Sequence, residues 1–195
     1  MSASKVRSVA LFQIIAAVAL GLGLQALTLG ISDDEAYYWV LAQKPALGYA
    51  FHPPAVAWFI ALSQKIFGFI LGSASVGVVR FPAVLLLTGT LACALLWLRD
   101  ATGRAPRWQD AGLALSLPGL FALGWMMVPD LPLFLGWTLA FWMAWRLCFG
   151  QLEAGRELGI AFFLGIGVAL ASLSKFSGIL VAISAFLSVA VWARG

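Results

Sequence analysis

Long apolar runs constrain this chain more than any other feature of its sequence. Runs of roughly 18 or more apolar residues recur along its 195 residues, and 63% of all residues are hydrophobic while 10% are charged. A run of that length is typical of a helix that crosses a bilayer, and backbone polar groups in lipid must be paired within the protein. The runs are continuous rather than alternating, which favours helices. The sequence therefore predicts an all-α, polytopic transmembrane helical bundle.

The remaining composition excludes several classes of protein. Cys93 and Cys148 both fall inside apolar runs, so neither a disulfide framework nor a cysteine metal site is expected. The net charge is +4, but no basic cluster is interleaved with aromatic residues, which argues against a nucleic-acid partner. Lys5 and Arg7 precede an apolar run from Val9 to Leu29, which is longer than the core of a signal peptide. We expect an uncleaved first span.

Seven apolar runs lie at about 9–30, 54–71, 76–98, 111–128, 131–149, 158–174 and 178–193. If all seven crossed the membrane from an internal N-terminus, five of the twelve Lys and Arg residues would lie inside. Cytoplasmic loops normally carry an excess of these residues. A seven-span topology therefore conflicts with the charge distribution.

The run 54–71 is the best one to keep out of the membrane. It carries Ser63, Gln64 and Lys65 and begins at a Pro-Pro pair, which suits an interfacial or re-entrant helix. Six spans then remain, with juxtamembrane helices in an outward loop at 31–75. Eight of the twelve basic residues now lie inside: Lys5, Arg7, Arg99, Arg104, Arg107, Arg146, Arg156 and Arg194.

The six-span topology gathers the other charged groups on the non-cytoplasmic side, each at or near the end of a span. These residues are Asp33, Asp34, Glu35, His52, Arg80, Asp130 and Lys175. Ionisable residues so close to hydrocarbon are costly, which favours a functional site by default.

Each of these residues also has a plain structural interpretation. The carboxylates Asp34, Glu35 and Asp130 suit a general base or a metal ligand, but also helix caps. His52, Arg80 and Lys175 suit contacts to a phosphate, but also a polar turn or snorkelling side chains. Together, carboxylates and cations at a membrane face predict group transfer from a lipid-linked donor.

Five motifs in order resemble the GT-C superfamily of membrane glycosyltransferases, and especially the branch of protein O-mannosyltransferases and the lipid A aminoarabinose transferase. The resemblance covers nearly the whole chain, which is similar to the family's N-terminal catalytic module. The motifs are Asp34-Glu35-Ala36-Tyr37-Tyr38, Gly48-Tyr49 with His52-Pro53-Pro54, Val79-Arg80, Pro129-Asp130-Leu131-Pro132-Leu133 and Leu173-Ser174-Lys175-Phe176-Ser177-Gly178.

The resemblance implies roles for these residues and a substrate class. Asp34 would be the general base toward the acceptor, with Glu35 beside it and Asp130 as the second acidic position. The cationic residues would face a polyprenyl-phosphate sugar donor, and we group Tyr38 with them. The three carboxylates are the ligands if Mg²⁺ or Mn²⁺ is bound, and metal dependence is left open. The substrate-binding set is His52, Arg80, Lys175 and Tyr38.

Two departures from the family pattern keep alternatives open. Phe51 stands where the family usually has an acidic residue, and family members commonly have more spans and a C-terminal part, which we do not expect in this chain. The second hypothesis is therefore a non-catalytic or truncated fragment that binds a lipid-linked sugar or awaits a partner subunit. A transporter fits less well, because its site would lie mid-bilayer. The expected location is a bacterial inner membrane, with the site facing the periplasm and a lipid, glycan or protein acceptor.

Overall fold

The computed structural model describes residues 3–117, 120, 123–150, 152 and 155–192, and all regular elements in those ranges are helical. Their bounds are α1 Ala3–Ala26, α2 Asp33–Ala42, α3 Ala55–Leu71, α4 Val76–Thr102, α5 Trp108–Leu115, α7 Asp130–Phe149, α8 Glu157–Ser174, the 3₁₀ turn η1 Phe176–Gly178, and α9 Ile179–Trp192. The predicted all-α class is confirmed.

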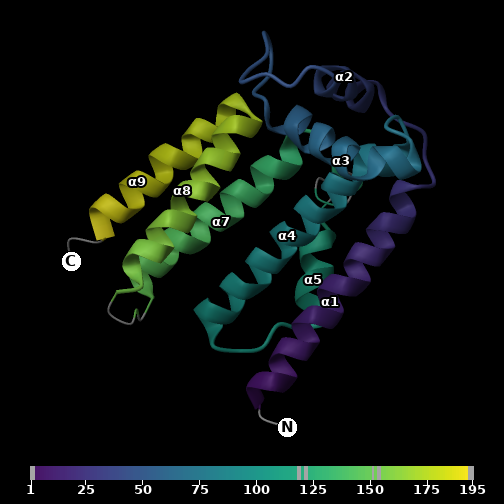
Figure 1. Ribbon diagram of the computed structural model, residues 1–195. Coiled ribbons are helices and arrows are strands. Elements are labelled where there is room, and N and C mark those ends of the chain that lie inside the picture. The colour runs from purple at the N-terminus through teal and green to yellow at the C-terminus, as the bar shows by residue number, and fades with distance from the viewer. Residues whose placement is uncertain (1–2, 118–119, 121–122, 151, 153–154, 193–195) are drawn as a thin grey trace.

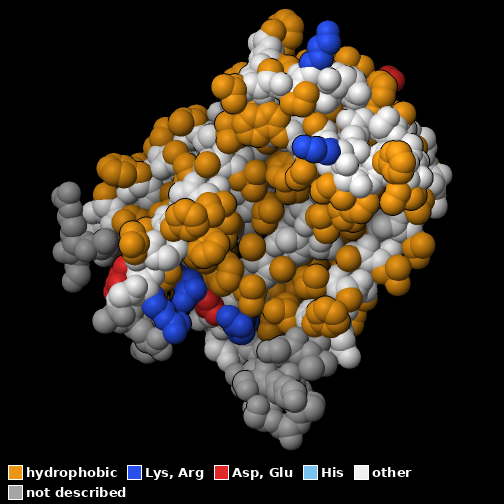
Figure 2. Space-filling view, viewed as in Figure 1, with side chains coloured by type: hydrophobic (Ala, Val, Ile, Leu, Met, Phe, Trp, Pro, Cys, Tyr) orange, Lys and Arg blue, Asp and Glu red, His pale blue; other side chains and the backbone are white. Residues whose placement is uncertain are grey.

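The long helices run side by side, and α2 and α3 lie across one end of them (Figure 1). We call this the α2–α3 end, and the other, where both termini lie, the opposite end. Hydrophobic side chains cover the middle of the visible face, while charged ones lie toward its two ends (Figure 2). This is the surface expected of a bundle that sits in a bilayer.

Among the described residues, three helices are long and apolar enough to cross a membrane: α4, α7 and α8. The stretch Leu11–Ala26 of α1, helix α3, and the segment Phe176–Trp192 are apolar but shorter. Helix α3 occupies the run excluded from the membrane in the six-span topology, and it crosses the ends of the long helices (Figure 1).

The predicted span at 111–128 is not one continuous helix. Helix α5 ends at Leu115, and residues 116–117 and 124–126 form turns and bends. The intervening sequence contains Pro118 and Gly119, which lie outside the described residues. Proline lacks an amide donor and disfavours helix at the preceding residue, a signal that the apolar count alone overlooked.

Helix α3 is fastened to α4 by a hydrogen bond that a proline makes necessary. Pro82 lies inside α4 and cannot donate to the carbonyl of Val78, four residues earlier. The hydroxyl of Ser63 on α3 donates to that carbonyl at 2.6 Å, and both residues are buried. Ser63, which marked this run as unusually polar, thus satisfies a backbone group of its neighbour.

Helices α7 and α8 form an antiparallel pair that packs through small residues. A Cβ added at Gly136 would lie 2.6 Å from the backbone nitrogen of Ala171, and one added at Gly167 would lie 2.7 Å from that of Ala140. Small residues four apart let helix backbones approach closely in membranes. This contact fixes the relative positions of the two ends of the pair, and both ends carry charged residues.

Candidate active site

A cavity of about 500 Å³ opens at the α2–α3 end. Four segments far apart in sequence surround it: α2, the loop before α3, the segment entering α7, and the turn after α8. Five of the seven predicted site residues line it: Asp34, Tyr38, His52, Asp130 and Lys175.

Helix α2 supplies one wall of the cavity. Its N-cap is Ser32, whose hydroxyl accepts from the backbone nitrogen of Glu35. Asp34, Tyr37 and Tyr38 then share one face, because residues three and four apart are neighbours on a helix. All three line the cavity. Asp34 is exposed, and its carboxylate makes no hydrogen bond or ion pair with any residue that the structure describes.

Tyr38 and His52 form the aromatic part of this wall. The Tyr38 hydroxyl lies 3.2 Å from His52 Nδ1, with ring centroids 5.4 Å apart. Burial raises the pKa of Tyr38 to about 12, with further contributions from the charges of Asp34, Tyr37 and Asp130. The phenol is therefore protonated at neutral pH and can donate a hydrogen bond. The charges of Asp34 and Asp130 both reach the Tyr38 hydroxyl, so the two carboxylates lie around the same part of the cavity.

Asp130 and Lys175 face the cavity from α7 and from the turn after α8. Asp130 is the first residue of α7, after Pro129, and Lys175 has extended backbone between α8 and η1. Lys175 Nζ lies 2.9 Å from Oδ1 of Asp130, and the two side chains are 47% and 28% exposed. An open pair of this kind leaves part of both charges available to a ligand.

Glu35 and Arg80 form a second ion pair that lies outside the cavity lining. Arg80 Nε donates to one carboxylate oxygen of Glu35 at 2.7 Å, and Nη2 donates to the other at 2.6 Å. The side chains are 0% and 1% exposed. This is a bidentate pair, the strongest geometry available to arginine and a carboxylate.

All five donors of the Arg80 guanidinium are used in this arrangement. Besides the two bonds to Glu35, Nη1 donates to the carbonyls of Ala26 and Leu29, and Nη2 donates to that of Gly30. Arginine has five N–H donors in all. The ring of Trp125 covers the guanidinium carbon at 4.7 Å. Arg80 therefore fixes the turn between α1 and α2.

Glu35 is equally occupied. One of its oxygens accepts from the backbone nitrogen of Met127 at 3.1 Å, and the other accepts from the backbone nitrogen of Ser32 at 3.1 Å. Burial acts to raise the pKa of this carboxyl, but hydrogen bonds from Arg80, Ser32 and Met127, together with the Arg80 charge, hold it below its ordinary value. The carboxylate joins α2, α4 and the segment that leads into α7.

The three predicted acidic residues do not form one set. Asp34 and Asp130 line the cavity. Glu35 is buried instead, and its oxygens accept the hydrogen bonds from Arg80, Ser32 and Met127 described above. Within the described ranges, no three or more His, Cys, Asp or Glu side chains are arranged to hold a metal ion. The residues present do not build the three-carboxylate metal site left open by the sequence.

Sequence reasoning did not assign several of the residues that shape the cavity. Tyr37 and Ser177 line it, and Phe51, 77% exposed, stands at the position of the missing acidic residue. The helical spacing from Asp34 was a usable signal for Tyr37. The contact of Glu35 with Met127, which is 92 residues away, had no signal in the sequence.

Comparison with known proteins assigns the family. The sequence profile described as dolichyl-phosphate-mannose-protein mannosyltransferase matches residues 51–195. The chain belongs to this family. The predicted resemblance to GT-C glycosyltransferases is thereby confirmed, and with it glycosyl transfer as the general activity of the family. His52, Arg80, Asp130 and Lys175 lie within the matched region, while Asp34 and Glu35 precede it.

A curated relative points the same way. The chain is 28% identical over 147 residues to a lipid A galacturonosyltransferase, RgtD, of Rhizobium johnstonii. The match includes 74% of this chain but only 28% of that relative. This mannosyltransferase-family chain thus spans less than a third of the length of the relative. No solved structure matches the present chain.

Proposed function

We propose that the chain carries the reaction site of a membrane glycosyltransferase that moves a sugar from a polyprenyl-phosphate donor to an acceptor hydroxyl. The observation that supports this most strongly is the cavity that joins Asp34, Asp130, His52 and Lys175 where the long helices end. Carboxylates for proton transfer and cations for a phosphate are the groups that such a transfer needs. A lipid-linked phosphate already lies at this depth.

Asp34 is the general base of the proposed reaction. As the acceptor oxygen bonds to the anomeric carbon, its proton passes to the Asp34 carboxylate, and the bond from that carbon to the phosphate oxygen breaks. The polyprenyl phosphate leaves with the electron pair of that bond, and the anomeric centre is inverted. Asp34 suits this task because it is exposed on the cavity and makes no bond to a described residue.

Lys175 and His52 stabilise the leaving phosphate. Lys175 already lies against the Asp130 carboxylate, which holds the ammonium group in place beside the cavity. His52 is positioned by the Tyr38 hydroxyl. An ammonium and a ring N–H aimed at a departing phosphate stabilise the charge that develops in the transition state.

In this proposal Glu35 and Arg80 act by positioning rather than by touching substrate. Their pair holds the first turn of α2, and therefore Asp34, against α4 and the segment that ends at Asp130. The sequence suggested that Arg80 contacts phosphate, but its five donors point to backbone carbonyls and to Glu35.

The proposed site faces the non-cytoplasmic side of the membrane. Arg99, Arg104, Arg107, Arg146 and Arg156 lie in or beside the helix ends at the opposite end, and α1 starts there with Lys5 and Arg7. Lys and Arg concentrate on the cytoplasmic side of membrane proteins. In a bacterial cell this orientation turns the cavity toward the periplasm.

Transfer of a radiolabelled sugar from polyprenyl-phosphate donors by the purified chain tests the proposal. We expect Asp34→Asn to lower turnover by about 10²-fold or more, the range of a general base. Asp33→Asn is the matched control, because Asp33 is also exposed but does not line the cavity. Normal turnover by Asp34→Asn, or equal losses in both variants, would reject Asp34 as the base.

The alternative is binding of a lipid-linked sugar without turnover, and Phe51 favours it. An exposed phenylalanine replaces a carboxylate of the family pattern at the cavity. Under this alternative the wild-type chain transfers no sugar, yet the donor protects His52 from chemical modification.

A further inference from the structure

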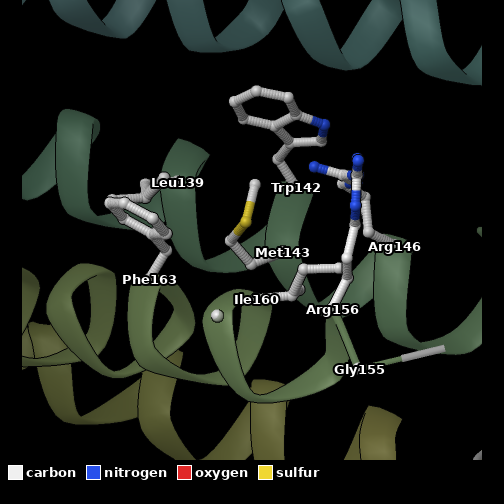
Figure 3. Close-up of a pocket in the computed structure, with 9 residues that line it drawn as sticks. Leu139, Trp142, Met143, Arg146, Gly155, Arg156, Ile160 and Phe163 are labelled. Carbon is white, nitrogen blue, oxygen red and sulfur yellow. The ribbon is translucent and has the colours of Figure 1, made fainter. Parts of the chain in front are cut away.

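A second cavity, of about 540 Å³, lies at the opposite end of the bundle, between α7 and α8 (Figure 3). It shares no residue with the cavity that carries Asp34. Its volume is in the range of sites that hold small-molecule ligands.

Helix α7 lines the cavity with one row of side chains, which are apolar toward the bundle centre and end in an arginine at the last turn. Residues three, four and seven apart lie on one helix face, and the row on α7 has this spacing: Leu139, Trp142, Met143 and Arg146. Arg146 is in the last turn, and Leu139 lies about 10 Å further along the axis, toward the bundle centre.

Helix α8 runs antiparallel to α7 and lines the cavity with a row of the same spacing that begins with the arginine: Arg156, Gly159, Ile160 and Phe163. Arg156 occupies the N-cap position of the helix, and Phe163 lies two turns further along the axis. Figure 3 shows Arg146 and Arg156 on one side of the cavity and Leu139 and Phe163 on the other, with Met143 and Ile160 between them. The cavity is therefore cationic at the helix ends and apolar toward the middle of the bundle.

At the cationic end of the cavity, Arg146 is only weakly paired with the nearby carboxylate of Asp100. Asp100 Oδ1 accepts from Arg99 at 2.9 Å, and Oδ2 accepts from the Trp142 indole at 3.1 Å. Arg146 Nε lies 3.8 Å from Oδ2, beyond hydrogen-bond distance. A bound anion would give the Arg146 guanidinium closer partners than Asp100 does.

We propose that this cavity binds an anionic glycerophospholipid of the membrane leaflet at the opposite end. The phosphate lies between Arg146 and Arg156, and an acyl chain lies along the apolar floor toward Leu139 and Phe163. Arginines suit phosphate because their forked donors match its oxygens, and basic pockets between transmembrane helices bind lipid headgroups in this way. The usual excess of Lys and Arg on the cytoplasmic side explains why arginines lie at this end of the bundle. It does not explain why two of them converge beside an apolar cavity.

Native mass spectrometry of the purified, delipidated chain tests this site with equal amounts of phosphatidylglycerol and phosphatidylcholine of the same acyl chains. We expect phosphatidylglycerol to be retained preferentially. Arg146→Gln and Arg156→Gln should each weaken its binding about fivefold, the effect of one basic group near a lipid surface. Arg107→Gln removes a charge at the same end but outside the cavity and should change nothing.

A second variant tests the apolar floor while keeping both arginines. A Cβ added at Gly159 meets no atom within 4 Å, so Gly159→Leu starts in open space, projects its side chain into the cavity and favours helix. We expect it to weaken phosphatidylglycerol binding, with helix content unchanged by circular dichroism. Equal retention of the two lipids, or an equal loss in Arg107→Gln, would overturn the proposal. So would displacement of phosphatidylglycerol by equimolar undecaprenyl phosphate, which would assign the cavity to a prenyl phosphate.

Discussion

Two carboxylate–cation pairs lie at the α2–α3 end, and they differ in their surroundings. Glu35 and Arg80 are enclosed, with every arginine donor used, whereas Asp130 and Lys175 are 28% and 47% exposed at the edge of the cavity. A buried pair that loses one partner leaves an unpaired charge in the interior, while water replaces a lost partner at an exposed pair. Glu35–Arg80 therefore holds elements of the fold together, whereas Asp130–Lys175 is accessible from the cavity.

Breaking the buried pair should have the largest effect on stability. Glu35→Ala leaves Arg80 without its carboxylate, and we expect a loss of about 3–5 kcal/mol in the free energy of unfolding. Thermal unfolding in detergent, followed by circular dichroism, measures the shift. Unchanged unfolding would show that the pair contributes nothing to the fold.

Acid should weaken the same pair without any substitution. Because folding lowers the pKa of Glu35 below 4.5, the pair stabilises the protein fully above about pH 4.5, and this contribution is lost as the pH falls through the lowered value. The difference in Tm between the wild type and Glu35→Gln should therefore shrink between pH 7 and pH 3. A difference that stays constant over this range would contradict the assignment.

A neutral buried contact should cost less than the charged pair. Ser63→Ala leaves the Val78 carbonyl without a donor, at an expected cost of about 1–3 kcal/mol. Pro82→Ala supplies a backbone donor to the same carbonyl, so the double variant should recover part of the loss in a thermal unfolding cycle. Strict additivity of the two substitutions would disprove this link between α3 and α4.

Removing the exposed cation should change stability least. For Lys175→Met we expect at most about 1 kcal/mol in unfolding free energy, together with a raised KM for the polyprenyl-phosphate donor. Donor titrations of turnover, run beside thermal unfolding, separate the two effects. A Tm loss as large as that of Glu35→Ala would remove the distinction between the two pairs.

Much of the fold follows from the lengths of the apolar runs. The runs at 76–98, 131–149 and 158–174 correspond to α4, α7 and α8, and 54–71, which charge balance, its polar residues and its Pro-Pro start set apart, corresponds to α3. The run at 111–128 was predicted as one span, but it contains turns and bends at 116–117 and 124–126, which a hydropathy count does not register. A count of apolar residues measures hydrophobicity, not the continuity of the helical backbone.

Five of the seven predicted site residues line one cavity, but the sequence did not distinguish the exposed carboxylate from the buried one. Asp34 and Glu35 are adjacent and chemically alike, so the sequence assigned both to catalysis. Successive residues on a helix point about 100° apart, and this rotation turns Asp34 to the cavity and Glu35 toward Arg80. Which of the two is buried depends on partners at 80 and 127, which only the tertiary structure brings together.

The most direct test of this division compares Asp34→Asn and Glu35→Gln in one preparation, with sugar transfer and Tm measured for each. Both substitutions replace a carboxylate by its amide, on neighbouring residues of α2. The account predicts that Asp34→Asn abolishes transfer while keeping the wild-type Tm, and that Glu35→Gln lowers Tm. A Glu35→Gln protein with wild-type Tm and no transfer would instead place Glu35 in the chemistry and contradict the account.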